Sequence, residues 1–474
     1  MEEQAGNYGR KFGEKKEKQK MSSIIQEAKY TCALGAQQTV LGIERAVPVI
    51  HAGPGCSARQ FAYTGMGAGY QGEGYAGGGQ IPCTNSSQNE VVFGGERKLG
   101  KLLDATLQVM DGDLYVVLAG CTAGIVGDDV RQVAREHAGE KPMVGVDTAG
   151  FRGNNYKGHE LVVEAIINQF VGDRQPETRK GLVNVFSVIP FQNPRWRGDL
   201  HEIKRLLQGL GLEVNILFGY GSSGVSEWED IPNAELNIVL SPWVGLHAAK
   251  LCEKKYGTPY LHEPILPVGL KATSAFLRRV AERLSLEKEA VEKFIKGEED
   301  IYKKYFVSVG DLFSDFASYL PYDAYIAADA AYGVGAADFL SGELGMQVVS
   351  FYEIDEPDAS ARKLVEESLE TAGKGLSEVL TVEGDNALIR EDIGRKIRER
   401  KNKSLILGSS WDRELAADTD SILLCFGVPV TDEVVLSKTY VGYDGALTLI
   451  EDIYSGLFEK GMITNTTHGE RDAI

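Results

Sequence analysis

The run Leu114-Tyr-Val-Val-Leu-Ala-Gly-Cys121 holds the clearest evidence of how this chain folds. Its first six residues are a continuous apolar run, which is typical of a strand buried on both faces of a parallel sheet. The glycine and cysteine then turn the chain into residues 124–138, whose spacing predicts an amphipathic helix with Asp128 and Asp129 in its early turns. Strand, glycine turn and helix in this order form the repeating unit of an α/β protein.

The same alternation recurs along the chain, and at 474 residues the protein is too long for a single core. We predict an α/β fold of three Rossmann-like domains with parallel sheets flanked by helices. A polar N-terminal arm (1–25) precedes a first domain at 26–180, a second at 181–320 that includes a helical extension (271–316), and a third at 321–474. The predicted strands are 46–51, 114–119, 182–187, 213–218, 236–241, 323–329, 347–352, 378–382, 404–408 and 421–425.

The charge and composition exclude several classes of protein. A net charge of −18 argues against a nucleic-acid partner. We find no run of ~18 apolar residues that could span a membrane, and the charged arm lacks the apolar centre of a signal peptide. Six cysteines in so long a chain do not form a disulfide framework. We therefore expect a cytoplasmic protein with no membrane partner.

Cys32, Cys56 and Cys121 are the candidate site residues, and all three belong to the predicted first domain. Each is expected where a strand ends and a helix begins, so that the positive end of the helix dipole favours the thiolate. Neighbouring glycines leave room for a bulky group, and this combination suits an iron–sulfur cluster. Because such clusters usually take four or more thiolates, an odd set of three calls for a second chain.

The other three cysteines have simpler interpretations. Cys252 on a predicted helix and Cys425 at the end of a predicted strand are expected to be core thiols. Whether Cys83, in Ile81-Pro82-Cys83-Thr84-Asn85, lies near the cluster stays open. It follows the glycine-rich run 65–79, which contains a formal G-x-G-x-x-G but lacks the strand and helix of a dinucleotide site. We expect that run to be a flexible or cluster-proximal loop. The sequence has no phosphate-binding loop, so any ATP would be hydrolysed by another protein.

Several motifs in register resemble the component 1 proteins of nitrogenase and nitrogenase-like reductases. They are Cys32-Ala-Leu-Gly-Ala-Gln, His51-Ala-Gly-Pro-Gly-Cys56, Val92-Phe-Gly-Gly-Glu-Arg-Lys-Leu99, Cys121 with Ile-Val-Gly-Asp-Asp129, Val239-Leu-Ser-Pro-Trp243, Lys255-Tyr-Gly-Thr-Pro-Tyr260, Leu407-Gly-Ser-Ser410 and Gly442-Tyr-Asp-Gly-Ala446. The resemblance implies the fold of that family. It also implies that Cys32, Cys56 and Cys121 ligate half of an eight-iron P-type cluster (P-cluster), which is shared with a homologous alpha-type subunit in a heterotetramer.

The resemblance further indicates a beta-type subunit. Alpha-type chains hold the catalytic cofactor through one more cysteine in the second domain and one histidine in the third. Here the matching cysteine position is Ser241, and no histidine lies between His262 and His468. The implied role is electron relay: an ATP-hydrolysing iron protein supplies electrons, and the P-type cluster passes them to the catalytic cofactor in the partner subunit.

The substrate stays open at this stage. Where nitrogenase beta chains can use a serine as a redox-switchable ligand, this sequence offers Gly150, so serine ligation is not expected. The departures favour a nitrogenase-like reductase, and a methylthio-alkane reductase that cleaves carbon–sulfur bonds is one such relative. The alternatives are the beta subunit of a dinitrogen-reducing nitrogenase, a cluster-assembly scaffold, or a subunit of a tetrapyrrole reductase with a four-iron cluster.

Overall fold

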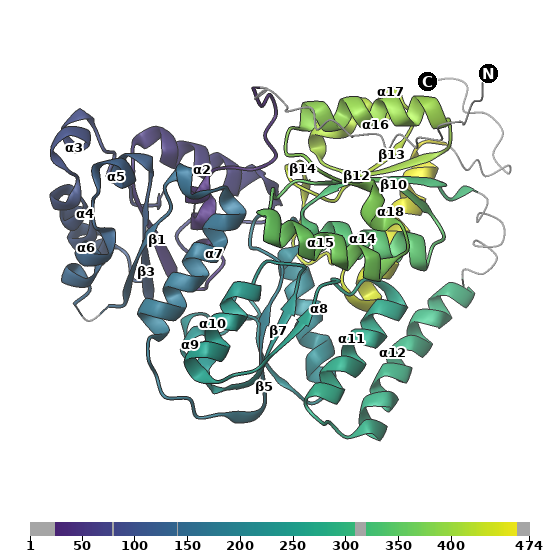
Figure 1. Cartoon of the computed structure of the whole chain (residues 1–474), viewed down its shortest axis with the longest axis horizontal. Helices are drawn as coiled ribbons and strands as arrows, with labels where there is room; N and C mark the ends of the chain where they lie inside the picture. The colour runs from purple at the N-terminus through teal and green to yellow at the C-terminus, as the bar shows by residue number, and fades with distance from the viewer. Residues whose placement is uncertain (1–23, 78–79, 140, 309–318, 462–474) are drawn as a thin grey trace, which may run out of the picture.

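The computed structural model of the protein describes residues 24–77, 80–139, 141–308 and 319–461 (Figure 1). Most of the predicted polar arm and residues 309–316 of the predicted helical extension lie outside this part of the chain. The three larger sheets, each parallel throughout, follow one another along the chain, and Figure 1 shows them in blue, teal and green to yellow. The predicted α/β class is confirmed.

The first sheet has the strand order β1-β3-β4, and every residue of β1 and β3 is buried. This burial explains why both strands are continuous apolar runs, since helices cover both faces. The strands are β1 (Ala46–His51), β3 (Leu114–Ala119) and β4 (Met143–Asp147). The helices are η1 (Ala33–Ala36), α1 (Gln37–Leu41), α2 (Pro54–Met66), α3 (Gln88–Phe93), α4 (Glu96–Val109), α5 (Cys121–Val126), α6 (Val130–His137), η3 (Gly150–Arg152), α7 (Asn155–Ala165) and η4 (Ile166–Val171).

The single helix predicted over residues 124–138 is two helices. Gly127 ends α5 in the left-handed region (φ 87°), where a glycine is free of Cβ strain. Asp129 then starts α6, because its side chain accepts hydrogen bonds from the backbone N–H groups of Arg131 and Gln132. The amphipathic pattern is real, but the Gly127-to-Asp129 turn divides it.

The second sheet has the order β6-β5-β7-β8. Its strands are β5 (Arg179–Phe186), β6 (Glu213–Asn215), β7 (Ala234–Leu240) and β8 (Tyr260–Glu263), with helices α8 (Trp196–Gly209), α9 (Val225–Glu229), η5 (Ile231–Asn233), α10 (Leu246–Tyr256), α11 (Gly269–Arg283) and α12 (Lys288–Ser308). β6 ends three residues before its predicted end at 218, because Leu217 adopts a positive φ of 66° and turns the chain out of the sheet.

The third sheet has the order β11-β10-β9-β12-β13. β10 and β11 lie on one side of β9, and β12 and β13 lie on the other, so the strand order switches sides between β9 and β12. Its strands are β9 (Asp323–Ala328), β10 (Gln347–Glu353), β11 (Leu380–Val382), β12 (Ser404–Gly408) and β13 (Ile422–Cys425). Its helices are α14 (Ala330–Gly342), α15 (Ala359–Ala372), η7 (Leu376–Val379), α16 (Asn386–Arg400), η8 (Ser410–Asp412), α17 (Arg413–Asp418) and α18 (Gly442–Glu459).

Segments far apart in sequence tie the three sheets together. The glycine-rich run contains a strand, β2 (Ala68–Tyr70), which pairs in parallel with β14 (Val430–Val434) from the C-terminal part of the chain. The prediction that this run is a loop is therefore wrong for residues 65–66, which end α2, and for residues 68–70, which form β2. α18 packs against α8, α11 and α12, the helices that accompany the second sheet.

The domain limits at 180 and 320 stay a prediction. No helix in the described part of the chain is long and apolar enough to cross a bilayer.

Candidate metal centre

The carboxyl ends of β1, β3 and β4 meet at one edge of the first sheet, where parallel α/β proteins bind their ligands. β1 leads through Gly53 into α2, and Cys56 lies in the first turn of that helix. β3 leads through Gly120 into α5, whose first residue is Cys121. β4 leads to Gly150 at the start of η3. Two of the predicted ligands thus follow strands as expected.

Cys32 reaches this edge from another direction. Residues 24–31 form no strand, so the prediction that Cys32 follows one is wrong; the residue caps η1. An antiparallel bridge joins its backbone to Asn154, and the Asn155 side chain accepts a hydrogen bond from Thr31 N at 2.8 Å. These contacts hold Cys32 beside the segment that follows β4.

Lys29 fixes the segment that carries Cys32 to the third sheet. Its side chain is fully buried, and its Nζ donates hydrogen bonds to Ser409 Oγ at 2.7 Å and Val428 O at 3.3 Å, with Asp412 Oδ2 at 3.6 Å. Burial lowers the pKa of Lys29, and the charge of Asp412 opposes that shift. The position of Cys32 therefore depends on contacts made by residues nearly 400 positions later.

Gly150 lies between two of the thiols. A Cβ built on Gly150 would lie 3.0 Å from Cys121 Sγ, 3.3 Å from Cys32 Cβ and 3.9 Å from Cys32 Sγ. Its φ is not positive, so the glycine is required by space and not by backbone conformation. Any larger residue would enter the space between Cys32 and Cys121, which is the space that a bound group shared by these thiols must use.

Amide N–H groups point at the sulfur atoms. Gly150 N donates to Cys121 Sγ at 3.1 Å, and Gln60 Nε2 lies 3.7 Å from Cys32 Sγ. Hydrogen bonds of this kind stabilise thiolates and tune the potential of a cluster bound to them. Gln60 is 1% exposed, so its amide is held in a fixed place beside Cys32.

The predicted ligands lie together and influence one another. The thiols of Cys32, Cys56 and Cys121 are exposed, whereas Cys252 and Cys425 are buried, as predicted for core thiols. Burial raises the pKa of the Cys56 thiol, and the charges of Cys32, Cys121 and Cys83 raise it further. Thiolates brought so close repel each other, and a bound cation removes that cost.

The spread of these thiols fits a multi-iron group better than a single ion. In the described part of the chain, no three His, Cys, Asp or Glu side chains are grouped so that they could hold one metal ion. In an iron–sulfur cluster each thiolate binds a different iron, so the ligands lie further apart. The exposed thiols of Cys32 and Cys121 beside Gly150, with an N–H donor at each, and the exposed Cys56 at the same sheet edge fit such a group.

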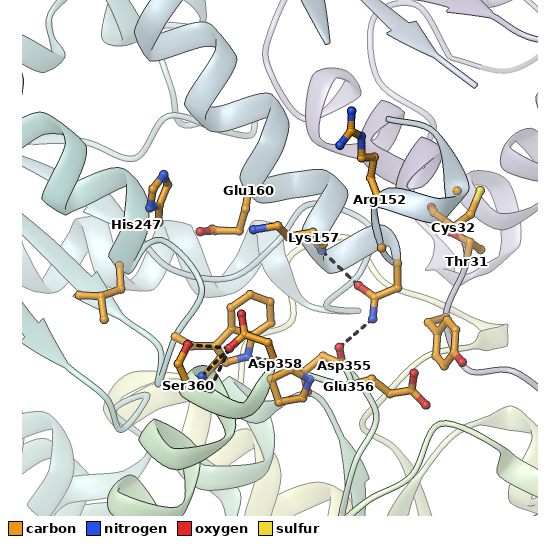
Figure 2. Close-up of a pocket in the computed structure, with 18 of the residues that line it drawn as sticks. Thr31, Cys32, Arg152, Lys157, Glu160, His247, Asp355, Glu356, Asp358 and Ser360 are labelled. Atoms are coloured by element: carbon orange, nitrogen blue, oxygen red, sulfur yellow. Dashed lines mark hydrogen bonds between the residues drawn. The ribbon is translucent and has the colours of Figure 1, made fainter. Parts of the chain in front are cut away.

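A cavity of about 970 Å³ adjoins this edge. Figure 2 shows Cys32 and Arg152 on one side, His247 on the opposite side, and Asp355, Glu356 and Asp358 along the floor. The lining thus comes from all three segments of the chain that carry the sheets.

The cavity wall is held by buried carboxyl groups. Asp355 accepts a hydrogen bond from Trp243 Nε1 at 2.8 Å, and Glu160 accepts one from Gly245 N at 2.8 Å. Burial raises the pKa of Glu160 to about 7. Burial also raises the pKa of Asp355, which lies close to the buried carboxyl group of Glu353.

Exposed apolar side chains surround the cysteine edge. α3 presents Val92 and Phe93, which are 68% and 84% exposed, and α3 packs beside α5, where Ile125 is 75% exposed. Phe151 of η3 is also exposed. Apolar groups gathered on one face favour a protein interface.

Sequence reasoning missed several residues that build this edge. Lys29 and Gln60 carry no local signal, since their partners are distant in sequence. Asp128, considered earlier as a helix-start residue, instead accepts from Gly95 N at 3.0 Å and pairs with His51 Nε2 at 2.9 Å, which ties the end of β1 to the turn after α5. The motif His51-Ala-Gly-Pro-Gly-Cys56 was the available hint that His51 matters.

The chain is similar to known proteins over most of its length. The family model of nitrogenase component 1 type oxidoreductases matches residues 31–458. The "nitrogenase molybdenum-iron protein beta chain" of Methanococcus maripaludis is 26% identical over 477 residues, which cover 91% of this chain and 94% of that protein. The "nitrogenase molybdenum-iron protein alpha chain" of Methanothermobacter marburgensis is 26% identical over 446 residues, with coverage of 90% and 87%.

The fold has a solved counterpart. A structure described as "Nitrogenase Cp1 at pH 6.5" matches with a TM-score of 0.76 at 20% identity and covers 95% of this chain and 97% of its own. The family implies iron–sulfur chemistry, which the exposed thiols around Gly150 accommodate. The chain therefore belongs to the nitrogenase component 1 type oxidoreductases, as the sequence motifs predict.

Proposed function

We propose that this chain is the beta-type, electron-relay subunit of a nitrogenase-like two-component reductase. In this proposal Cys32, Cys56 and Cys121 hold half of a P-type iron–sulfur cluster, and a homologous alpha-type subunit completes it. The observation that carries the proposal is that the exposed thiols of Cys32 and Cys121 meet beside Gly150, at the sheet edge that also carries Cys56, although Cys32 arrives from a separate segment of the chain.

The residues of this chain have defined tasks in that role. The cluster supplies one-electron transfer when bound. The Gly150 and Gln60 amides would donate to its thiolate ligands, and the absence of a side chain at Gly150 would leave it room. Lys29 would hold Cys32 at the site through its contacts with Ser409 and Val428.

Two features support a beta-type chain without its own catalytic cofactor. Ser241, which stands where alpha-type chains carry a cofactor cysteine, is 0% exposed and does not line the cavity. The sequence between His262 and His468 contains no histidine. Without these two anchors, a cofactor of the alpha type would have no protein ligands here, so we place it in the partner subunit.

The exposed apolar rim supports a partner at this edge. Val92, Phe93 and Ile125 would be covered by the alpha-type subunit or by an ATP-hydrolysing iron protein that delivers electrons. By analogy with the alpha and beta chains among its relatives, we propose a heterotetramer. The substrate would be reduced in the partner. Reduction of methylthio-alkanes and of dinitrogen are the two candidates, and assays of the assembled enzyme separate them.

The test is anaerobic co-purification of this chain with its proposed alpha-type subunit, followed by iron analysis and EPR across a redox titration. We expect about eight irons per pair, the number that a P-type cluster requires, in addition to those of the partner's cofactor. Cys56→Ala and Cys121→Ala should each remove the signal of the shared cluster. Cys252→Ala is the matched control, because that thiol is buried on α10 and should leave iron unchanged.

Other outcomes lead to other functions. About four irons at the interface would indicate the tetrapyrrole-reductase type of site. A full cluster that passes to an added acceptor protein would indicate an assembly scaffold. An iron content that stays the same in Cys56→Ala and Cys121→Ala would overturn the proposed ligand set.

A further inference from the structure

Residues 82–86 extend the first sheet by one more parallel segment beside β1. The segment lies on the side of β1 away from β3, so Cys83 joins the edge that carries Cys56 and Cys121. The backbone hydrogen bonds are Ile50 N to Pro82 O (2.8 Å), Thr84 N to Ile50 O (2.9 Å) and Ser86 N to Ala52 O (2.9 Å).

Side-chain contacts fix this segment against the end of β1. Thr84 Oγ1 accepts from Ala52 N at 3.1 Å and also contacts His51 Nδ1 at 3.1 Å. The Cys83 thiol lies 3.5 Å from Ala52 O, and Asn85 N donates to Cys83 Sγ at 3.4 Å. Ala52 immediately precedes the turn that leads to Cys56, and Gly120, which precedes Cys121, donates to the neighbouring His51 O at 3.0 Å. The Cys83 sulfur therefore lies at the sheet edge from which Cys56 and Cys121 start.

We propose that Cys83 is a fourth iron ligand, so that the free chain holds a four-iron cluster on Cys32, Cys56, Cys83 and Cys121. This rests on the proposed function, because it takes the other three thiols as iron ligands. Three cysteine ligands leave one iron of a [4Fe–4S] cluster to an external ligand or to a partner chain, whereas four thiolates are its full ligand set.

Two observations distinguish Cys83 from the other additional thiols. It is half-buried and so reachable from the site, whereas Cys252 and Cys425 are 0% and 2% exposed. Its sulfur accepts a backbone N–H hydrogen bond, as that of Cys121 does, whereas the sulfur of Cys425 contacts the side chains of Ser410 and Arg413.

The binding step is a ligand exchange without electron transfer. A synthetic [4Fe–4S] cluster carrying four mercaptoethanol thiolates exchanges each of them for a cysteine of this chain. Each cysteine thiol gives its proton to the departing thiolate, which leaves as free mercaptoethanol, and the cysteine sulfur forms the new bond to iron. The charge and oxidation level of the cluster are unchanged.

The experiment adds this cluster, made with isotopically labelled mercaptoethanol, to the full-length free chain under anaerobic conditions. Iron and retained label are then measured per chain after gel filtration. We expect about four irons and no retained label for the wild type, and about four irons with one label for Cys83→Ala, since one iron keeps its external thiolate. Cys252→Ala is the matched control and should behave as the wild type does.

The outcomes separate this inference from the proposed function. One retained label on both the wild type and Cys83→Ala would overturn the role of Cys83 and leave the three-thiol site standing. A free chain that binds no iron, together with a co-purified pair that contains iron, would also overturn the role of Cys83 and leave the three-thiol site standing. Absence of iron from both the free chain and the pair would overturn both proposals. Alkylation of the loaded wild type by iodoacetamide gives an independent reading: Cys83 should be protected together with the other three.

Discussion

The Lys29→Met substitution keeps the aliphatic stem of the side chain and removes the ammonium group that holds the Cys32 segment on the third sheet. Lys29 Nζ loses its contacts with Ser409 Oγ, Val428 O and Asp412 Oδ2 at 2.7, 3.3 and 3.6 Å. Breaking a buried ion pair by removing one partner costs about 3–5 kcal/mol. The Asp412 carboxylate still accepts hydrogen bonds from Ser409 N at 2.7 Å and Asn386 Nδ2 at 3.1 Å. We therefore expect a loss of stability at the lower end of this range, about 3 kcal/mol.

This loss should appear as local opening of residues 24–32. Hydrogen exchange followed by mass spectrometry is the assay, since Lys29 N donates to Gly384 O at 2.9 Å and is protected only while the segment is docked. A cost of about 3 kcal/mol corresponds to ~100-fold faster exchange through local opening. Lys363→Met, on the exposed face of α15, is the control and should leave this peptide unchanged. Exchange at the wild-type rate in Lys29→Met would refute the idea that Lys29 positions Cys32.

Three further substitutions test the surroundings of the site. Glu160→Gln should stabilise the protein above pH 7 by up to about 3 kcal/mol and have little effect near pH 4, which denaturant titrations at both values would show. The sign follows from the raised pKa: the folded state binds the proton more tightly, so the wild type loses stability as pH rises from about 4.5 to about 7. Gly158→Ala places a Cβ 2.2 Å from Ala33 O and should lower the thermal midpoint by several degrees, since α7 must move away from η1. Gly150→Val should cut bound iron to less than about half while the circular dichroism spectrum stays the same, because its side chain enters the space beside the Cys121 sulfur.

Each of these has a result that would count against its reasoning. Equal stability of Glu160→Gln and wild type at pH 8 would mean that the buried carboxyl group carries no cost. A normal thermal midpoint in Gly158→Ala would mean that α7 and η1 tolerate separation. Full iron content in Gly150→Val would mean that the bound group does not occupy the space between Cys32 and Cys121.

The strands were the most predictable part of the fold. β1, β3 and β12 match their predicted bounds to within a residue, because a strand buried on both faces must be apolar throughout. Boundaries set by single residues were less visible in the sequence. Leu217 with its positive φ, and the Gly127-to-Asp129 turn, each ended an element that the apolar pattern alone would have continued.

The sequence predicted the cysteines of the candidate site but not the residues that hold them in place. A cysteine after a glycine turn is a local pattern, and Cys56 and Cys121 follow it. The docking of Cys32 depends on Lys29, whose partners lie nearly 400 residues away, and no local pattern reports such a contact. Cys83 gave no signal of its own either, since only the pairing of its segment with β1 brings it to the edge.

The most direct test of the central claim is anomalous diffraction at the iron absorption edge from crystals of this chain with its alpha-type partner. The account predicts iron peaks within bonding distance of the sulfur atoms of Cys32, Cys56 and Cys121, at the junction of the two subunits. Iron confined to the partner, with these three thiols unligated, would contradict it.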